Sequence, residues 1–121
     1  MSQDKLNEIL RDIEAASGGM VEGVALVSVE GLMIGSALRQ GVNEEIVAAM
    51  AATLHSLGEQ AVRELQKGNL NGVFITGKRG YVLVGRVGSN ALLLILARKE
   101  AKMGILLYQL NKAAKSLAEF L

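Results

Sequence analysis

Apolar residues recur at helical spacing in three stretches of the chain. Residues 6–13 hold four aliphatic side chains at positions i, i+3, i+4 and i+7, which predicts a first helix with Ser2 as its N-cap. A second, longer helix is expected over residues 43–67, about 25 residues or about 37 Å at 1.5 Å per residue. The third is expected over residues 102–120, with Ile105 among its buried side chains. Each helix therefore has an apolar side that needs a surface to cover it.

Shorter apolar stretches, rich in β-branched residues and bounded by glycine-containing turns, predict five strands. The first two, residues 21–29 and 32–34, form a hairpin, and strands over residues 72–76, 81–87 and 91–97 follow the middle helix. Short turns make neighbouring strands antiparallel. Because the last strand is apolar on both sides, both faces of the sheet must be covered. The predicted fold is α/β in the α+β sense: a three-layer sandwich of order α-β-β-α-β-β-β-α, with one five-stranded antiparallel sheet between helices.

Composition limits the classes of function. The chain has 121 residues, half of them hydrophobic and 21% charged, which indicates one globular domain over residues 1–121. A net charge of +1 and few aromatic residues argue against nucleic-acid binding. The longest apolar run, residues 91–97, is too short to span a bilayer, so no direct membrane insertion is expected. The N-terminus lacks the regions of a signal peptide, and a cytoplasmic location is the expectation.

Residues 23–34 carry a resemblance to a known family. They read Gly-Val-Ala-Leu-Val-Ser-Val-Glu-Gly-Leu-Met-Ile, and the hairpin signature of the Roadblock (dynein light chain) family is a Gly-led apolar strand followed by Ser-x-Asp-Gly-Leu-x-Ile. Glu30 stands where the family usually has Asp. Asn90, the aliphatic run 92–96 and Gly104 before the last helix also resemble the family's end, and the order of elements matches over the whole chain. The resemblance implies a profilin-like fold, with the middle helix on one sheet face and the terminal helices on the other.

The resemblance also implies a function. The family's MglB-like GTPase regulators are homodimers, and a similar chain would bind and regulate a small Ras-like GTPase, with stimulation of GTP hydrolysis as one form of regulation. Family members dimerise by pairing the third strand and packing the middle helix against its twin. The residues expected at this dimer interface are Met50, Leu54, Leu57, Ala61, Val73, Phe74 and Ile75.

The sequence independently allows such a dimer, because residues 73–76 form an apolar strand with neither proline nor charge. Such a strand, left as a bare edge, would invite aggregation. The alternative is that these residues are ordinary core of a monomer. Two other functions remain open: a passive scaffold or adaptor light chain, and a small-ligand sensory domain.

The sequence gives little support for a catalytic site, a cofactor site or a metal site. Residues 72–78 fit the Gly-x-x-x-x-Gly-Lys part of a phosphate-binding loop, but Arg79 replaces the following Ser or Thr and a strand replaces the following helix. We therefore expect a strand and a turn there, and no bound nucleotide. His55 and Glu59 lie at i and i+4 on the middle helix, yet zinc needs three or four ligands. No metal, cofactor or catalytic residue is predicted, and the chain is not expected to be an enzyme; His55 is expected on the helix surface or at the dimer interface.

Basic residues raise one further alternative. Lys78, Arg79 and Arg86 are interpreted as a basic corner at a solvated hairpin tip. An arginine supplied in trans can accelerate GTP hydrolysis, and Arg39, Arg79 and Arg86 are the candidates for it. Family regulators similar to this chain instead hold the GTPase's own switch residues, and that mode is preferred.

Overall fold

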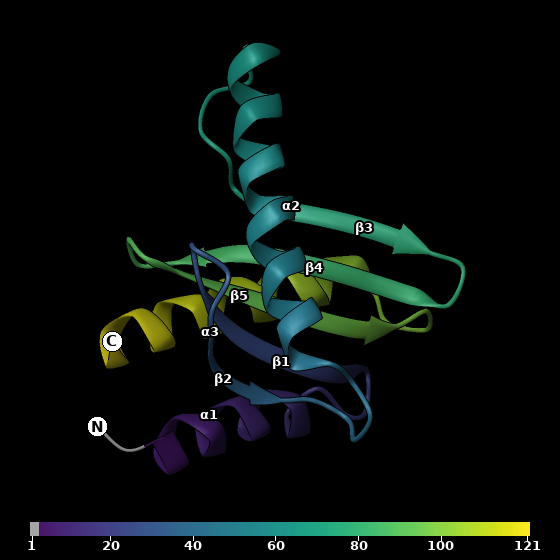
Figure 1. Ribbon diagram of the computed structural model, residues 1–121. Coiled ribbons are helices and arrows are strands. Elements are labelled where there is room, and N and C mark those ends of the chain that lie inside the picture. The colour runs from purple at the N-terminus through teal and green to yellow at the C-terminus, as the bar shows by residue number, and fades with distance from the viewer. Residues whose placement is uncertain (1–2) are drawn as a thin grey trace.

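The computed structural model describes residues 3–121 and shows one five-stranded sheet with helices on both faces (Figure 1). Ser2, the expected cap of the first helix, lies outside the described residues. The elements are α1 (Gln3–Ala15), β1 (Val21–Ser28), β2 (Met33–Ala37), α2 (Glu44–Glu64), β3 (Val73–Gly77), β4 (Gly80–Val87), β5 (Ala91–Arg98) and α3 (Met103–Phe120). Their order and the fold class are those predicted.

The five strands are arranged in the order β2-β1-β5-β4-β3, and every neighbouring pair is antiparallel. The central strands β1 and β5 are far apart in the sequence but lie side by side, with Val24 opposite Ile95. Both are apolar on both sides and almost fully buried, as expected for strands covered on two faces. The short strands β2 and β3 form the two edges.

Two apolar clusters, one on each face of the sheet, make up the core. The larger lies between the sheet and the terminal helices, where Leu10 of α1 and Leu106 and Leu117 of α3 pack against the strands. The smaller lies under α2, where Ala48 and Ala51 face the sheet. The terminal helices therefore cover one face and the middle helix covers the other, as Figure 1 shows.

Local interactions define where two elements begin. The Asn43 side-chain oxygen accepts a hydrogen bond from the Ile46 amide at 3.1 Å and caps α2, and two glutamates follow in the first turn, where they favour the positive helix end. At the start of β4, Gly80 adopts φ 155°, and a Cβ there would collide with the Ala97 carbonyl oxygen of β5. Only glycine fits this close approach, so the tight turn between β3 and β4 depends on it.

Two sequence-based expectations for the helices need correction. The middle helix has 21 residues rather than about 25, because the chain turns left-handed at Gln66 (φ 59°) and Gly68 (φ 85°). In α3, the buried positions are Leu106, Leu110, Ala113 and Leu117, at i, i+4, i+7 and i+11. Ile105 precedes that series by one residue, or about 100° of helix rotation, and is 54% exposed.

Candidate interaction surface

The outward side of α2 carries a row of exposed apolar side chains. The row consists of Ile46, Met50, Leu57, Ala61 and the C-cap residue Leu65. At about 100° of rotation per residue, these positions fall within an arc of about 100°. The residues of α2 that are buried against the sheet are small, Ala48 and Ala51, or polar, His55. Several of the large apolar side chains of this helix therefore face away from the protein's own core, although Leu54 packs against it.

Strand β3 provides an unpaired edge beside this row. Among the described residues 3–121 it pairs only with β4, and the opposite side of its backbone faces outward at the end of the sheet. Val73 and Ile75 lie opposite Val84 and Val82, which belong to the cluster under α2, so the side chains of both point to the α2 face. Phe74 points to the other face and is 45% exposed. Backbone donors and acceptors next to exposed apolar side chains make an edge suited to pairing with another strand.

The helix crosses the edge strand at Gly58. A Cβ at this position would lie 2.9 Å from a methyl group of Val73 and 3.1 Å from one of Leu70, so a glycine permits the close contact. No residue of α2 beyond His55 is buried, and the helix continues past β3 into solvent, as Figure 1 shows. The six helical residues after Gly58 extend about 9 Å at 1.5 Å per residue. We call the apolar row on α2 together with the open edge of β3 the α2–β3 surface.

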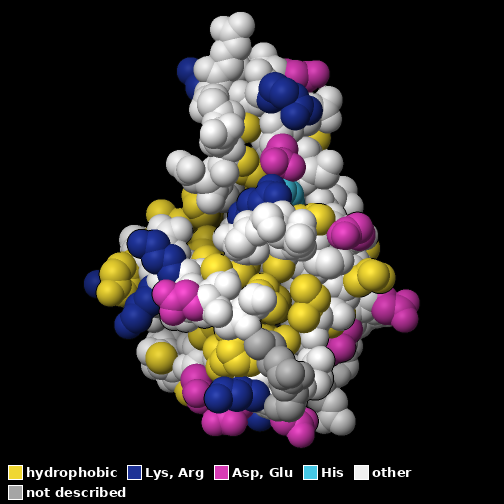
Figure 2. Space-filling model, turned by 90° about the vertical axis from the view of Figure 1, so that its left-hand side faces the viewer, with side chains coloured by type: hydrophobic (Ala, Val, Ile, Leu, Met, Phe, Trp, Pro, Cys, Tyr) yellow, Lys and Arg dark blue, Asp and Glu magenta, His cyan; other side chains and the backbone are white. Residues whose placement is uncertain are grey.

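A chain of side-chain contacts joins the base of this overhanging helix to the sheet. The His55 Nδ1 atom lies 3.5 Å from the Glu59 carboxylate, whose other oxygen lies 3.6 Å from an Arg86 guanidinium nitrogen. Arg86 also donates hydrogen bonds to the carbonyl oxygens of Gly88 (3.3 Å) and Ser89 (2.5 Å). The contacts therefore join α2 to the turn between β4 and β5. Figure 2 shows the histidine between acidic and basic side chains where the molecule narrows.

This arrangement corrects two predictions. His55 is neither a helix-surface residue nor part of the exposed row, because it is 6% exposed and faces inward. Arg86 does not form a basic corner with Lys78 and Arg79, because it lies near the opposite end of β4 from the turn that carries those two residues. Arg39 is held at 2.9 Å from Glu22.

The predicted interface residues fall into two groups. Met50, Leu57, Ala61, Phe74 and Ile75 are exposed, whereas Leu54 and Val73 are half-buried against the cluster under α2. Sequence reasoning missed Ile46 and Leu65, which continue the exposed row at both ends. Their spacing of four residues from Met50 and Ala61 is the signal that could have identified them.

The structure also shows how the segment that resembles a phosphate-binding loop is folded, and how the possible metal ligands are placed. Residues 73–77 are a strand followed directly by a two-residue turn and β4, so the phosphate-loop-like segment does not lead into a helix. Within residues 3–121, no group of three or more histidine, aspartate or glutamate side chains is placed to hold a metal ion. No helix in that part of the chain is long and apolar enough to cross a membrane.

The geometry described so far is that of a protein-interaction domain, with an open sheet edge beside an apolar helix. The family model for the Roadblock/LC7 domain matches residues 7–97. The chain belongs to this family, as the hairpin signature indicated. Among curated relatives, the uncharacterized protein MJ1340 of Methanocaldococcus jannaschii is 26% identical over 112 residues, which cover 93% of this chain and 96% of the relative.

Solved structures show the same fold. The Roadblock/LC7 domain from Streptomyces avermitilis has a TM-score of 0.86 at 23% identity, with 94% of this chain and 95% of the other covered. Myxococcus xanthus MglB has a TM-score of 0.86 at 18% identity, with 98% and 89% covered. Profilin II of Acanthamoeba castellanii has a TM-score of 0.63 at 17% identity, with 90% and 94% covered, which confirms the profilin-like architecture.

Proposed function

We propose that this protein is a homodimeric interaction module that binds and regulates a small Ras-like GTPase in the cytoplasm, without catalytic residues of its own. The observation that carries the proposal is the overhang of α2 past the open edge of β3, with large apolar residues facing outward. An isolated chain leaves this surface in water. Membership of the Roadblock/LC7 family supports the proposal, because the family resemblance implies a homodimer with paired middle helices.

The dimer forms by antiparallel pairing of β3 with β3 of a second copy. This pairing satisfies the open backbone groups of both edges and joins the two sheets into one. The overhanging end of each α2 then lies over the sheet of the other copy, and the two helices pack side by side. Leu57 and Ala61 lie near the point where α2 leaves its own sheet, and in the dimer they are buried between the helices. The same twofold symmetry makes the interface self-complementary.

The paired helices are the platform for the GTPase. A regulator shifts a GTPase between states only if it binds one of them more tightly, so the platform binds the GTP-bound switch conformation better than the GDP-bound one. Of the three arginines considered as a finger, Arg39 contacts Glu22, and Arg86 contacts Glu59 and the β4–β5 turn. Two of the three candidates are thus held by contacts within the chain, and the proposed mechanism holds the switch residues of the GTPase in place rather than supplying an arginine.

Light scattering of the purified chain over a dilution series tests the dimer. The expected mass is 25.6 kDa, twice the chain mass of 12.8 kDa. A persistent monomer overturns the platform mechanism, because a single chain cannot form a surface of two helices.

Regulation is tested in binding and hydrolysis assays with the Ras-like GTPase whose gene lies nearest in the genome. Binding is measured to its GDP form and to its complex with a non-hydrolysable GTP analogue, and we expect a preference for the latter of about tenfold, within the usual range of coupling between sites. The rate of GTP hydrolysis with and without the protein then shows the direction of regulation. A preference for the GTP form with an unchanged rate indicates the passive adaptor, and no preference contradicts regulation.

A further inference from the structure

The two edge strands of the sheet differ in what lies beside them. β2 and β3 have five residues each, and neither contains a charged side chain or a proline. Strands of this kind are templates for pairing with another chain when their outer edge is left open. Within residues 3–121, no side chain hydrogen-bonds to the backbone of β3. At the other edge, α1 lies alongside β2, as Figure 1 shows.

Two amide side chains of α1 hydrogen-bond to the backbone of β2. The Asn7 Oδ1 atom accepts a hydrogen bond from the Ser36 amide at 3.2 Å. The Gln3 Nε2 atom donates one to the Ile34 carbonyl oxygen at 2.7 Å and another to Asn7 Oδ1 at 3.4 Å. Since residues 34 and 36 are two apart on one strand, their backbone groups point to the same side, which is the side away from β1. The two amides therefore lie where a further strand would pair.

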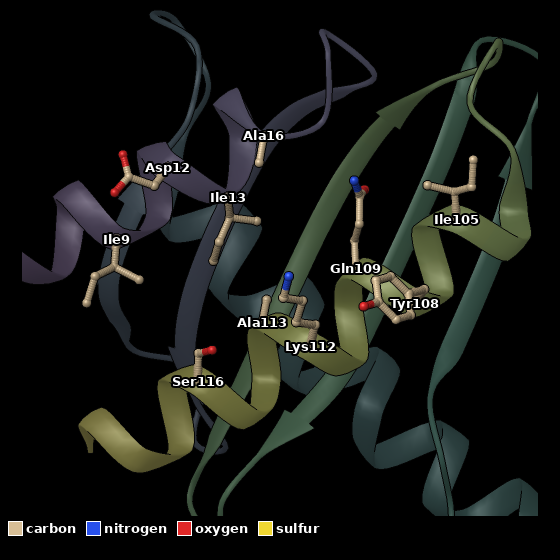
Figure 3. A pocket seen from close by; sticks show the side chains of 10 residues that line it. All are labelled: Ile9, Asp12, Ile13, Ala16, Ile105, Tyr108, Gln109, Lys112, Ala113 and Ser116. Carbon is tan, nitrogen blue, oxygen red and sulfur yellow. The ribbon is translucent and has the colours of Figure 1, made fainter.

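Packing holds these two side chains at the edge. Leu6 and Leu10 of the same helix are buried in the core cluster between the sheet and the terminal helices. A Cβ at Gly35 would lie 2.8 Å from a Leu6 methyl group and 3.1 Å from the Asn7 side-chain oxygen, so a glycine lets α1 lie close to β2. The helix stands over β1 and β2, whereas α3 stands over β4 and β5, with a groove of about 480 Å³ between them (Figure 3). The β2 half of the sheet, rather than α3, therefore defines the place of α1.

The side chains of Gln3 and Asn7 match the groups that they bind. A carboxamide carries the same kinds of donor and acceptor as a peptide group. Here one amide gives a donor to a carbonyl oxygen of β2, and the other gives an acceptor to an amide of β2, as a neighbouring strand would. A second chain has to displace both side chains before it can pair with this edge.

We propose that α1 covers the β2 edge through Gln3 and Asn7 and thereby limits self-assembly of this protein to one edge of the sheet. With β3 open and β2 covered, two copies use their open edges on each other and form a closed pair. With both edges open, each added copy would present a new edge and assembly would continue as a ribbon. The closed pair rests on the β3 pairing of the proposed function, whereas the cover on β2 is a property of the single chain.

The double variant Gln3→Ala/Asn7→Ala tests the proposal on the full chain. Gln3 is exposed and Asn7 is half-buried, so the variant is expected to fold, which circular dichroism verifies. In light scattering over a dilution series, the wild type is expected at 25.6 kDa, twice the chain mass of 12.8 kDa. At high concentration the variant is expected to reach at least 51.2 kDa, four times the chain mass, because uncovered β2 edges join two pairs. A folded variant with the wild-type mass at every concentration overturns the proposal.

Glu8→Ala/Arg11→Ala is the matched control. It places the same number of alanines at exposed positions of the same helix and leaves the net charge unchanged. Its mass is expected to follow that of the wild type, because both hydrogen bonds to β2 remain. Equal growth of the two double variants shows that a change in the helix, and not the uncovered edge, drives assembly, and it overturns the proposal.

Ser36→Pro, added to Gln3→Ala/Asn7→Ala, locates the new contact. Proline lacks the backbone donor, and the Ser36 amide points away from β1, so the pairing of β1 with β2 keeps its hydrogen bonds. The mass is expected to return to that of the wild type. A mass that stays raised shows that the new contact lies elsewhere, which overturns the assignment to β2.

The same measurements separate this proposal from the proposed function. The mass of the wild type alone decides whether β3 pairs, and the difference between the wild type and the double variant decides whether α1 covers β2. A monomeric wild type contradicts the β3 pairing but not the cover on β2. In that case the double variant is expected as a dimer of 25.6 kDa, joined through the β2 edge alone.

Discussion

Replacing Leu57 by glutamate is the sharpest test of the α2–β3 surface. In the single chain Leu57 is 60% exposed, at the centre of the apolar row and next to the crossing at Gly58. Full burial of a leucine side chain contributes about 1.5–3 kcal/mol, so burying the exposed part contributes about 1–2 kcal/mol per copy. Two copies related by a twofold axis lose about 2–4 kcal/mol per dimer.

The expected result is a large rise in the dimer dissociation constant. Since each 1.4 kcal/mol is a factor of ten, the loss of burial alone raises it about thirty- to several-hundred-fold. Two added carboxylates in an apolar interface raise it further, because neither has a basic partner on the row. Light scattering over a dilution series is expected to show the variant as a 12.8 kDa monomer where the wild type is still a dimer.

Ser56→Glu is the matched control for this experiment. It adds the same charge to the same helix at an exposed position, about 100° of rotation from Leu57. Its mass is expected to follow that of the wild type. Because Leu57 is exposed in the single chain, its replacement changes monomer stability by less than about 1 kcal/mol, and circular dichroism separates dissociation from unfolding. A folded Leu57→Glu chain that dilutes like the wild type refutes the interface assignment.

Three further substitutions, two of them with a matched control variant, test the fold through denaturant midpoints. Gly58→Ala is expected to lower the free energy of unfolding by about 1–3 kcal/mol, because the new Cβ meets Val73 at 2.9 Å; an unchanged midpoint contradicts the close crossing. Gly104→Ala, whose Cβ meets nothing within 4 Å, is its control and is expected to gain up to about 1 kcal/mol. Gly80→Ala is expected to cost at least about 2 kcal/mol through its collision with β5, and a smaller loss shows that the turn can relax. Asn43→Ala is expected to cost about 1 kcal/mol, whereas Asn43→Ser, which keeps a capping oxygen, is expected to cost much less.

The spacing of apolar residues predicted the helices and strands of this chain well, because most of them pack their apolar sides against the rest of the fold. The apolar run of β5 required two covered faces, and the structure places it at the centre of the sheet. The hairpin signature identified both the family and the layer arrangement. Connection lengths then determined which strands are antiparallel neighbours, although the pairing of β1 with β5 depends on the whole sheet rather than on any local pattern.

The orientation of α2 is where sequence reasoning was weakest. Its apolar surface extends around much of the helix, so the sequence does not show which side faces the sheet. The structure buries the small residues Ala48 and Ala51 and exposes the larger Met50 and Leu57, because small side chains let the helix lie close to the strands. The inward position of His55 follows from that orientation. Likewise, Arg86 could be separated from the β3–β4 turn only once the length of β4 was known.

The proposed pairing of β3 has a consequence for assembly that follows from symmetry. An antiparallel pairing of β3 with its copy has its twofold axis perpendicular to the sheet, so each face of one copy continues as the same face of the other. Both α2 helices then lie on one face of a sheet of ten strands, five from each copy, and the terminal helices of both copies lie on the opposite face. A GTPase on the platform therefore leaves the face with the terminal helices uncovered. A dimer of this form can hold a GTPase on one side while its opposite face stays accessible to a larger partner, so regulation and adaptor function are compatible in one molecule.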